Sequence, residues 1–243
     1  MAGMPMVDLH LHLLPDVDDG CKTMDETLAM AKALVALGFT AAAPSPHNRP
    51  EYANRDVALQ RLDEVKVALK SAGIALALDV NAENFFLDES LLMKLPTPES
   101  RRIGTAGKYL LVEAPYTSPL PQLTDVVFRM KLKGVTPVIA HPERCLEFER
   151  KGRAAEAVQS GALLQLDVGS LVGRYGKSAQ KLAKQFLDDG LYAISATDLH
   201  SPVGAEQWVS ESLKALQKQV GAKAFSQLTE NNPGLILKGL PVA

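Results

Sequence analysis

The sequence predicts an α/β fold built around a parallel β-sheet. Short apolar runs alternate with longer segments of helical periodicity along the whole 243-residue chain. The runs are nearly continuous in apolar residues, as in parallel strands that are covered on both faces. They recur about every 26 to 35 residues with a helical segment between them, which is the spacing of successive βαβ units. Seven such runs predict a barrel or an open wound sheet.

Each of the seven runs is predicted to be a strand. In chain order they are PMVDLHLH (5–12), FTAAAPSPH (39–47), IALALDVNAE (74–83), YLLVEAP (109–115), VTPVIAHPE (135–143), ALLQLDVGS (162–170) and LYAISATDLH (191–200). Connections between parallel neighbours of this kind are nearly always right-handed.

Helix signals lie between these strands. The segment TMDE is a capping box, in which Thr23 caps a helix and Glu26 reaches back, and Gly38 stands where this helix should end. Three more helices, each followed by a glycine, are predicted at 52–72, 178–187 and 206–220. Residues 95–102 (LPTPESRR) are the most loop-like stretch, but they are too few for a domain linker.

The length predicts one domain that covers residues 1–243. Barrels of the α/β class commonly use about 200–250 residues as one unit. A chain of this size buries roughly 70–75% of the surface that its unfolded form exposes, so it does not need disulfides or metals merely to fold. Any metal ligands are therefore expected to be functional.

The composition excludes several classes of partner. The formal net charge is -2 and no long basic run appears, which argues against nucleic acid. Cys21 and Cys145 are too few for a disulfide framework and fit a reducing compartment. The most apolar segment, 33–43, is too short to cross a bilayer, and the N-terminus lacks a basic start. We therefore expect a cytoplasmic protein without a membrane span.

All five histidines stand at the carboxyl ends of predicted strands: His10, His12, His47, His141 and His200. These strand ends carry the functional groups of parallel α/β folds. A single histidine in such a place is more often structural than a ligand. Five together favour one shared site, because barrel closure brings the strand ends into a ring.

Two pairs of polar residues repeat the same spacing. His10 and His12 are two apart on a strand, so both side chains point to one face and can bind one metal ion. A hydrogen-bonded core pair would give the same pattern, but Asp198 and His200 repeat it in the last strand. Carboxylates stand at two further strand ends, 83 and 113, where a lone acid could instead cap a helix. The repetition favours a metal site.

Together with Asp19, these residues make nine candidate ligands, more than one ion takes from protein, so two or three divalent ions are predicted. The set is His10, His12, Asp19, His47, Glu83, Glu113, His141, Asp198 and His200. Nitrogen and oxygen donors without thiolate suit Mn, Fe, Zn or Co better than Ca, with Mn²⁺ the first choice and Mg²⁺ a further alternative. Such ions generate a metal-bound hydroxide and clamp the oxygens of an in-line displacement, which predicts phosphate-ester hydrolysis.

These motifs resemble the PHP superfamily, named for polymerase and histidinol phosphatase domains. The similarity is closest to the bacterial metal-dependent tyrosine phosphatases of capsule and exopolysaccharide loci. It rests on DLHLHLLPDVDDG, SPHN, NAE, VEAP, AHPERC, LDVGSLVGRYG and ATDLHS, in family order over nearly the whole chain. The resemblance implies a distorted (β/α)7 barrel, a trinuclear metal site and a single PHP-type catalytic domain.

The resemblance also divides the ligands among three ions. It implies His10, His12, Glu83 and Asp198 for the first ion, Glu83, Glu113 and His141 for the second, and Asp19, His47 and His200 for the third. Asp18 is expected to shape the turn rather than to bind. Arg144, His47 and Asp198 are expected to take part in catalysis.

Arginines are expected to hold the phosphate. Arg144 in HPERC and Arg174 in VGRYG are the candidates, although each could equally be an ordinary surface arginine, and Arg144 is favoured. Two positions depart from the family pattern: Asn48 stands where a second histidine is frequent, and Ala205 stands where an arginine is frequent. We expect these departures to change phosphate affinity or substrate choice.

The leading hypothesis is a protein-tyrosine phosphatase whose substrate is a phosphotyrosine protein, expected to be a bacterial tyrosine kinase linked to capsule or exopolysaccharide. A histidinol-phosphate-type or other small-molecule phosphatase is the nearest alternative, and a non-catalytic metal-binding regulatory module is another. An amidohydrolase also begins with H-x-H, but Glu113 stands where its bridging lysine is expected. A thiol mechanism is disfavoured, because neither Cys21 nor Cys145 begins a C-x5-R loop.

Overall fold

The computed structural model describes residues 5–84 and 87–242. Residues 1–4 and 243 of the predicted domain, and residues 85–86, lie outside this description. Within it the strands are β1 (Met6–Asp8), β2 (Phe39–Ala42), β3 (His47–Asn48), β4 (Ala77–Leu78), β5 (Glu83–Asn84), β6 (Tyr109–Glu113), β7 (Thr136–Ala140), β8 (Leu163–Asp167) and β9 (Tyr192–Ala196).

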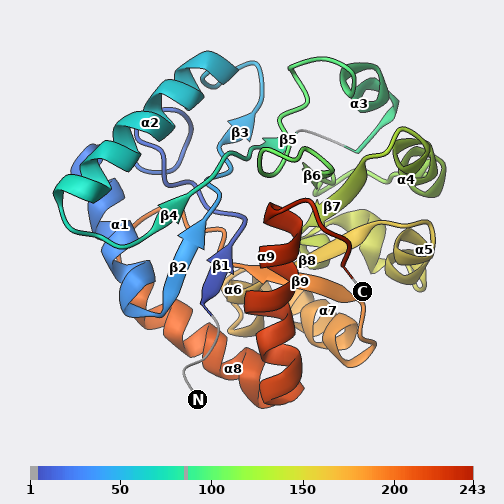
Figure 1. Cartoon of the computed structure of the whole chain (residues 1–243). Helices are drawn as coiled ribbons and strands as arrows, with labels where there is room; N and C mark the ends of the chain where they lie inside the picture. The colour runs from blue at the N-terminus through green and yellow to red at the C-terminus, as the bar shows by residue number, and fades with distance from the viewer. Residues whose placement is uncertain (1–4, 85–86, 243) are drawn as a thin grey trace.

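The strands form two parallel sheets, in the orders β1-β2-β4 and β3-β5-β6-β7-β8-β9. A parallel bridge between Leu11 and Leu199 joins the segment after β1 to the segment after β9. Backbone hydrogen bonds from His12 to Leu199 (2.7 Å) and from Asp198 to His10 (2.8 Å) flank this bridge. The segments that follow the first and last strands are therefore side by side, and the predicted α/β fold with a distorted barrel is confirmed (Figure 1).

The prediction of seven continuous strands is wrong at the second and third runs, because each divides into two. The second run splits into β2 and β3 around Pro44 and Pro46, which have no N–H to donate to a sheet. The third run splits into β4 and β5, and between them the Asn81 side chain donates to the Leu9 carbonyl (2.7 Å). The second halves of both runs pair with each other in the larger sheet.

Helices surround the strands, as Figure 1 shows. They are α1 (Met24–Ala36), α2 (Arg55–Ser71), α3 (Glu89–Lys94), α4 (Leu123–Leu132), α5 (Arg153–Gln159), α6 (Val168–Leu171), α7 (Gly176–Asp188), α8 (Ala205–Ser226) and α9 (Asn232–Leu237). Within α8, Gly221 has φ 77°, so the helical path breaks where the sequence predicted an end. None of the described helices is both long enough and apolar enough to cross a membrane.

Local capping explains where two predicted helices begin. The Thr23 hydroxyl accepts a hydrogen bond from the Glu26 N–H (3.2 Å), as the predicted capping box requires. The Glu26 carboxylate reaches back to the Lys22 N–H (2.6 Å), one residue before Thr23. The Asn54 side chain caps α2, which starts at Arg55 rather than at 52. These caps set the length of the loops that lead from the strands into α1 and α2.

Candidate metal centre

The structure brings all nine candidate ligands together at one mouth of the barrel. Their ligating atoms form four overlapping groups, and within each group the atoms lie within 4.8 Å of one another. The groups are His12, Asp19, His47 and His200; His10, His12 and Glu83; His10, His141 and Asp198; and Glu83, Glu113 and His141. The last group has the composition implied for the second ion, and the first group contains the residues implied for the third.

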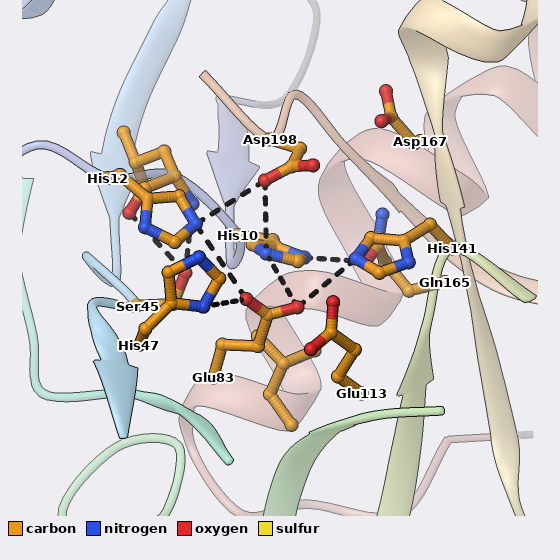
Figure 2. A network of polar contacts seen from close by, with 12 residues as sticks. His10, His12, Ser45, His47, Glu83, Glu113, His141, Gln165, Asp167 and Asp198 are labelled. Atoms are coloured by element: carbon orange, nitrogen blue, oxygen red, sulfur yellow. Dashed lines mark hydrogen bonds and ion pairs between the residues drawn. The ribbon is translucent and has the colours of Figure 1, made fainter. Parts of the chain in front are cut away.

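The strand-end prediction needs one correction. His10, His12, His141 and His200 follow β1, β7 and β9, as predicted. His47 instead begins the short strand β3, because the second run breaks at its prolines. It pairs in register with Glu83, the first residue of β5. This pairing places the His47 and Glu83 side chains next to each other and turned into the barrel mouth (Figure 2).

Glu83 lies at the centre of the cluster and is 2% exposed. Its Oε1 is 3.1 Å from His141 Nε2 and 3.4 Å from His10 Nε2. Its Oε2 is 2.7 Å from His47 Nδ1 and 3.9 Å from His12 Nε2, as Figure 2 shows. One carboxylate thus faces four histidines from three segments of the chain, which is the placement that a bridging ligand needs.

Outer hydrogen bonds orient the first histidine pair. His10 Nδ1 lies 2.9 Å from Gln165 Oε1, and His12 Nδ1 lies 2.7 Å from Asp18 Oδ2. In each ring the other nitrogen, Nε2, faces the cluster and is 3.2 or 3.4 Å from Asp198 Oδ1. Holding Nδ1 in this way fixes the ring and leaves Nε2 as the nitrogen that can ligate a metal ion.

The two neighbouring aspartates have different tasks. Asp18 shapes the turn, as predicted, by accepting a hydrogen bond from the Gly20 N–H (2.9 Å), but it also orients His12, which the sequence did not reveal. Asp19 lies on the rim, with Oδ1 3.3 Å from His47 Nε2 and 3.6 Å from His200 Nε2. A Cβ at position 20 would lie 2.3 Å from the His12 carbonyl oxygen, so only glycine fits in this turn.

Several buried atoms of the cluster lack a hydrogen-bond partner among the described residues. They include His10 Nε2, His12 Nε2 and Glu113 Oε1. Buried polar atoms are almost always paired, and each of these three residues belongs to a ligand group that contains Glu83. Hard carboxylate oxygens and imidazole nitrogens are the donors that divalent transition metals accept. The residues present therefore fit a divalent metal ion.

Backbone strain is concentrated at two of the candidate ligands. His141 has φ 33° and Asp198 has φ 51°, in the left-handed region that residues with a Cβ rarely adopt. Such conformations cost of order 1–3 kcal/mol each and persist where the surroundings enforce them. His141 directly follows β7 and Asp198 lies two residues after β9, and both side chains point into the mouth.

The histidines and carboxylates of the cluster shift each other's ionisation. Burial lowers the pKa of His10, but the Asp198 and Glu83 carboxylates outweigh it and raise that pKa to about 10. Burial also lowers the pKa of His47, but the Asp19 and Glu83 carboxylates outweigh burial and raise that pKa to about 10. Burial would raise the pKa of Glu83, yet His10 above all holds it well below its usual range. A cation that binds here must displace protons.

Arg144 reaches the edge of the cluster, as the sequence predicted. Its Nη1 is 2.5 Å from Asp198 Oδ2 and 3.0 Å from Asp167 Oδ2, and its Nη2 donates to the Tyr116 hydroxyl (3.0 Å). The guanidinium also lies over the Tyr175 ring, 3.9 Å from the centroid. This places a fixed cation directly beside a candidate metal ligand.

The sequence reasoning missed two charged residues of this mouth. Asp167 is fully buried at the end of β8, and burial, with the nearby Asp198 charge, raises its pKa to about 7 despite Arg144. Its place at a strand end was the signal that could have revealed it. Arg49 forms an ion pair with Glu113 Oε2 from the segment after β3. Glu113 Oε1 is left to face Glu83 and His141.

Three other positions are not as expected. The Arg174 guanidinium lies over the Trp208 ring (4.1 Å), and within the described residues its side chain makes no ion pair with the nine ligands. Asn48 donates to Asn84 Oδ1 (2.9 Å) and to the Glu99 carbonyl (2.6 Å), so it serves the scaffold. Ala205 is 1% exposed in the main core, and an arginine there would not fit without rearrangement.

The cysteines do not provide a nucleophile. Cys21 and Cys145 are free thiols, each 1% exposed. Burial raises the pKa of Cys21 to about 11 and raises that of Cys145 well above its usual value. Because the thiolate is the reactive form, both thiols are inert at neutral pH, in agreement with the absence of a C-x5-R loop in the sequence.

Comparison with known proteins places this geometry in a family. The model of the capsular polysaccharide synthesis family CpsB/CapC matches residues 6–238. Tyrosine-protein phosphatase YwqE of Bacillus subtilis is 30% identical over 242 residues, which cover 93% of this chain and 89% of that protein. A structure from a crystallographic study of YwqE from Bacillus subtilis and CpsB from Streptococcus pneumoniae, described as unique metal-dependent tyrosine phosphatases, matches with a TM-score of 0.89 at 27% identity. That match covers 98% of this chain and 96% of the other.

A more distant match concerns the fold alone. Histidinol phosphate phosphatase from Lactococcus lactis, solved with zinc, L-histidinol and phosphate, has a TM-score of 0.56 at 10% identity, over 93% of this chain and 95% of that chain. This likeness supports the barrel architecture. It does not distinguish between substrates, because one fold hosts many activities.

Proposed function

Because the chain belongs to the capsular polysaccharide synthesis family CpsB/CapC, we propose that it is a metal-dependent phosphatase that hydrolyses phosphotyrosine in proteins. The observation that carries this proposal is the convergence of nine imidazole and carboxylate ligands beside Arg144. The similarity to named tyrosine-protein phosphatases supports the reaction and the substrate class.

The proposed cofactor is a set of two or three divalent ions, with Mn²⁺ the first choice and Fe, Zn, Co or Mg as alternatives. When bound, such ions lower the pKa of a water molecule and neutralise the phosphate. The proposed ligands are His10, His12, Asp19, His47, Glu83, Glu113, His141, Asp198 and His200. Glu83 is shared by two of the four groups, which supports more than one ion, because that carboxylate has an oxygen on each side of the cluster.

Arg144 is the proposed phosphate-binding residue and, with His47 and Asp198, a proposed catalytic group. The planar guanidinium suits two phosphate oxygens at once. Asp167 and the two tyrosine rings fix its orientation before substrate arrives. Arg174, whose guanidinium lies over the Trp208 ring, is the second proposed phosphate-binding residue.

Arg49 is a proposed positioning residue for Glu113. By holding Oε2, it turns the other carboxylate oxygen toward Glu83 and His141. Its positive charge also adds to the attraction for a phosphate dianion, at a site where position 205 carries no arginine. This arrangement compensates in part for the departure from the family pattern at Ala205.

The proposed preference for phosphotyrosine rests on its leaving group and on an aromatic side chain at the edge of the metal centre. A phenol has a pKa near 10, well below that of an alkyl alcohol, so its departure needs less help from a general acid. Tyr116 is 40% exposed, and its ring stacks on His141 at 5.6 Å, which offers an aromatic surface beside the cluster. The proposed substrate is a phosphotyrosine protein such as a bacterial tyrosine kinase.

The domain organisation of the protein, its compartment and its link to capsule or exopolysaccharide are also proposed. We expect residues 1–243 to act as one catalytic domain, which the family match over 6–238 supports. The two free thiols favour work in the cytoplasm. A link to capsule or exopolysaccharide regulation is supported by the name of the family.

A substrate comparison tests the proposal. We expect kcat/KM for a phosphotyrosine peptide to exceed that for the matching phosphoserine peptide by about tenfold or more, because the leaving groups differ in pKa. Histidinol phosphate, assayed at the same Mn²⁺ concentration, should also be slower. Faster turnover of phosphoserine or histidinol phosphate would overturn the tyrosine assignment but leave the metal centre intact.

A further inference from the structure

A second concave site lies beside α2, the teal helix in Figure 1, and outside the metal centre. It is a cavity of about 640 Å³ between α2 and residues 95–107. Leu59, Leu62 and Leu95 supply apolar walls, and none of the nine candidate ligands lines it in the described part of the chain. Cavities of this size hold small organic molecules.

Three arginines line the same cavity: Arg55, Arg101 and Arg102. Arg102 donates to the Gly107 (2.8 Å) and Leu95 (2.7 Å) carbonyls, and Arg101 Nη2 donates to the Ala53 carbonyl (3.3 Å). Within residues 5–84 and 87–242, neither Arg101 nor Arg102 forms an ion pair. Both charges are thus met only by the partial charges of backbone carbonyls.

Arg101 is the least satisfied of the three. Its Nε and Nη1 are buried and lack a hydrogen-bond partner among the described residues. Burial, and then the neighbouring Arg55, lower its pKa, against a smaller opposing effect of Asp56. Asp56 is 91% exposed and lies 3.5 Å from Arg55, so solvent screens most of its charge. An unpaired buried guanidinium is costly unless an anion meets it.

The backbone of Arg101 is held firmly. Its N–H donates to Asn84 Oδ1 (3.2 Å), and Asn84 Nδ2 donates to its carbonyl (2.8 Å). Asn84 is 1% exposed in β5. The guanidinium is therefore presented from a fixed point of the fold, which reduces the entropy lost on binding a ligand.

We propose that this cavity, the Arg101 cavity, binds a small organic anion whose carboxylate or phosphate group pairs with Arg101 and whose apolar part lies against Leu59, Leu62 and Leu95. The positive charge of the Arg101 guanidinium attracts either acid group. The apolar walls select anions that carry a ring or a short hydrocarbon chain over inorganic ions. The charge and the lining are both needed for this selectivity.

Ligand-observed NMR on the full, metal-loaded chain tests the proposal with three probes: benzoate, phenylphosphonate and neutral benzyl alcohol. We expect at least one of the two anions to bind with a Kd of about 1 mM or tighter, and benzyl alcohol to bind about tenfold more weakly. The tighter of the two anions identifies the preferred acid group. Phenylphosphonate also resembles a substrate, so only binding that depends on Arg101 counts.

Variants separate this cavity from the metal centre. Arg101→Met should weaken anion binding about tenfold or more, whereas Arg129→Met, which removes an equal charge from an exposed position of α4, should leave it unchanged. If Arg101→Met does not fold, Leu59→Trp, which fills the cavity from a half-buried position, should abolish binding. Equal binding by the wild type and the folded variant, equal binding of benzyl alcohol, or no anion binding at about 10 mM would overturn the proposal.

Discussion

Replacing Asp18 by asparagine separates a residue that orients a ligand from a ligand itself. The Asp18 carboxylate is buried and accepts three hydrogen bonds: from Gly20 N–H (2.9 Å) at Oδ1, and from His47 N–H (3.0 Å) and the His12 ring (2.7 Å) at Oδ2. Asparagine has one acceptor oxygen, so its NH₂ group must face a donor on one side. The variant loses both the negative charge and at least one of these bonds.

The expected cost follows from the contact with His12. A hydrogen bond to an ionised group contributes about 1.5–3 kcal/mol, and every 1.4 kcal/mol is tenfold in an equilibrium constant. Loss of an outer partner of a metal-binding histidine typically weakens metal binding by about 10–100-fold. Asp18→Asn should therefore weaken metal affinity by this factor while all nine ligands remain in place.

The assay is a Mn²⁺ titration of chelator-treated protein, read as hydrolysis of p-nitrophenyl phosphate. Asp18→Asn should need about 10–100-fold more Mn²⁺ but approach the wild-type plateau. Asp19→Asn removes a candidate ligand charge 3.3 Å from His47, so its plateau should stay about tenfold or more below the wild type at any Mn²⁺ concentration. Circular dichroism of both variants checks folding.

Two results would refute this reasoning. If both variants were equally inactive at saturating Mn²⁺, Asp18 would be a ligand and the register of the turn would be wrong. If Asp18→Asn bound Mn²⁺ as tightly as the wild type, the contact between Asp18 and His12 would not orient the ring.

Three further predictions follow from the site. Arg144→Met should raise KM for a phosphotyrosine peptide about tenfold or more, because a charge-assisted contact is lost. The control Arg150→Met, which removes an exposed arginine beside Glu147, should leave KM unchanged. Equal KM values for the two variants would exclude Arg144 as the phosphate-binding residue. Cys145→Ser should keep most of the activity, because the thiol is buried and protonated; a hundredfold loss in folded protein would revive a thiol mechanism. The folded pKa of His10 is about 10, above the unfolded value near 6.5, so the imidazolium stabilises the metal-free protein below pH 6.5 and this stabilisation is lost as the pH rises toward 10. Mn²⁺ competes with that proton, so the Tm difference between loaded and chelated protein should widen from about pH 6.5 to 9; a constant difference would contradict the coupling.

The sequence predicted which side chains gather in the candidate metal centre, because strand ends are local features. The H-x-H and D-x-H spacings fix which side chains share a face, and parallel topology brings the strand ends together. His10 and Asp198 could therefore be predicted to meet although they lie far apart in the chain. The capping residues around Thr23 were equally readable, because a cap depends on neighbours within a few residues.

Contacts that depend on the path of a loop could not be read in this way. The second predicted strand breaks at Pro44 and Pro46, which places His47 at the start of a new strand. The third breaks where the Asn81 side chain donates a hydrogen bond to the distant Leu9 carbonyl. The partner of Arg49 is 64 positions away, and nothing in its neighbourhood specifies Glu113. Position 205 is buried, which its sequence neighbours do not reveal, so Ala205→Arg is expected to lower the stability of the protein.

Metal content measured alongside turnover tests the central claim most directly. Protein freed of metal by a chelator is reloaded with Mn²⁺ in steps, the bound metal is counted by mass spectrometry, and phosphotyrosine-peptide hydrolysis is followed at each step. The account predicts no turnover in the metal-free chain and full turnover only when two or three ions are bound per chain. Full hydrolysis by a folded chain that contains no metal would contradict it.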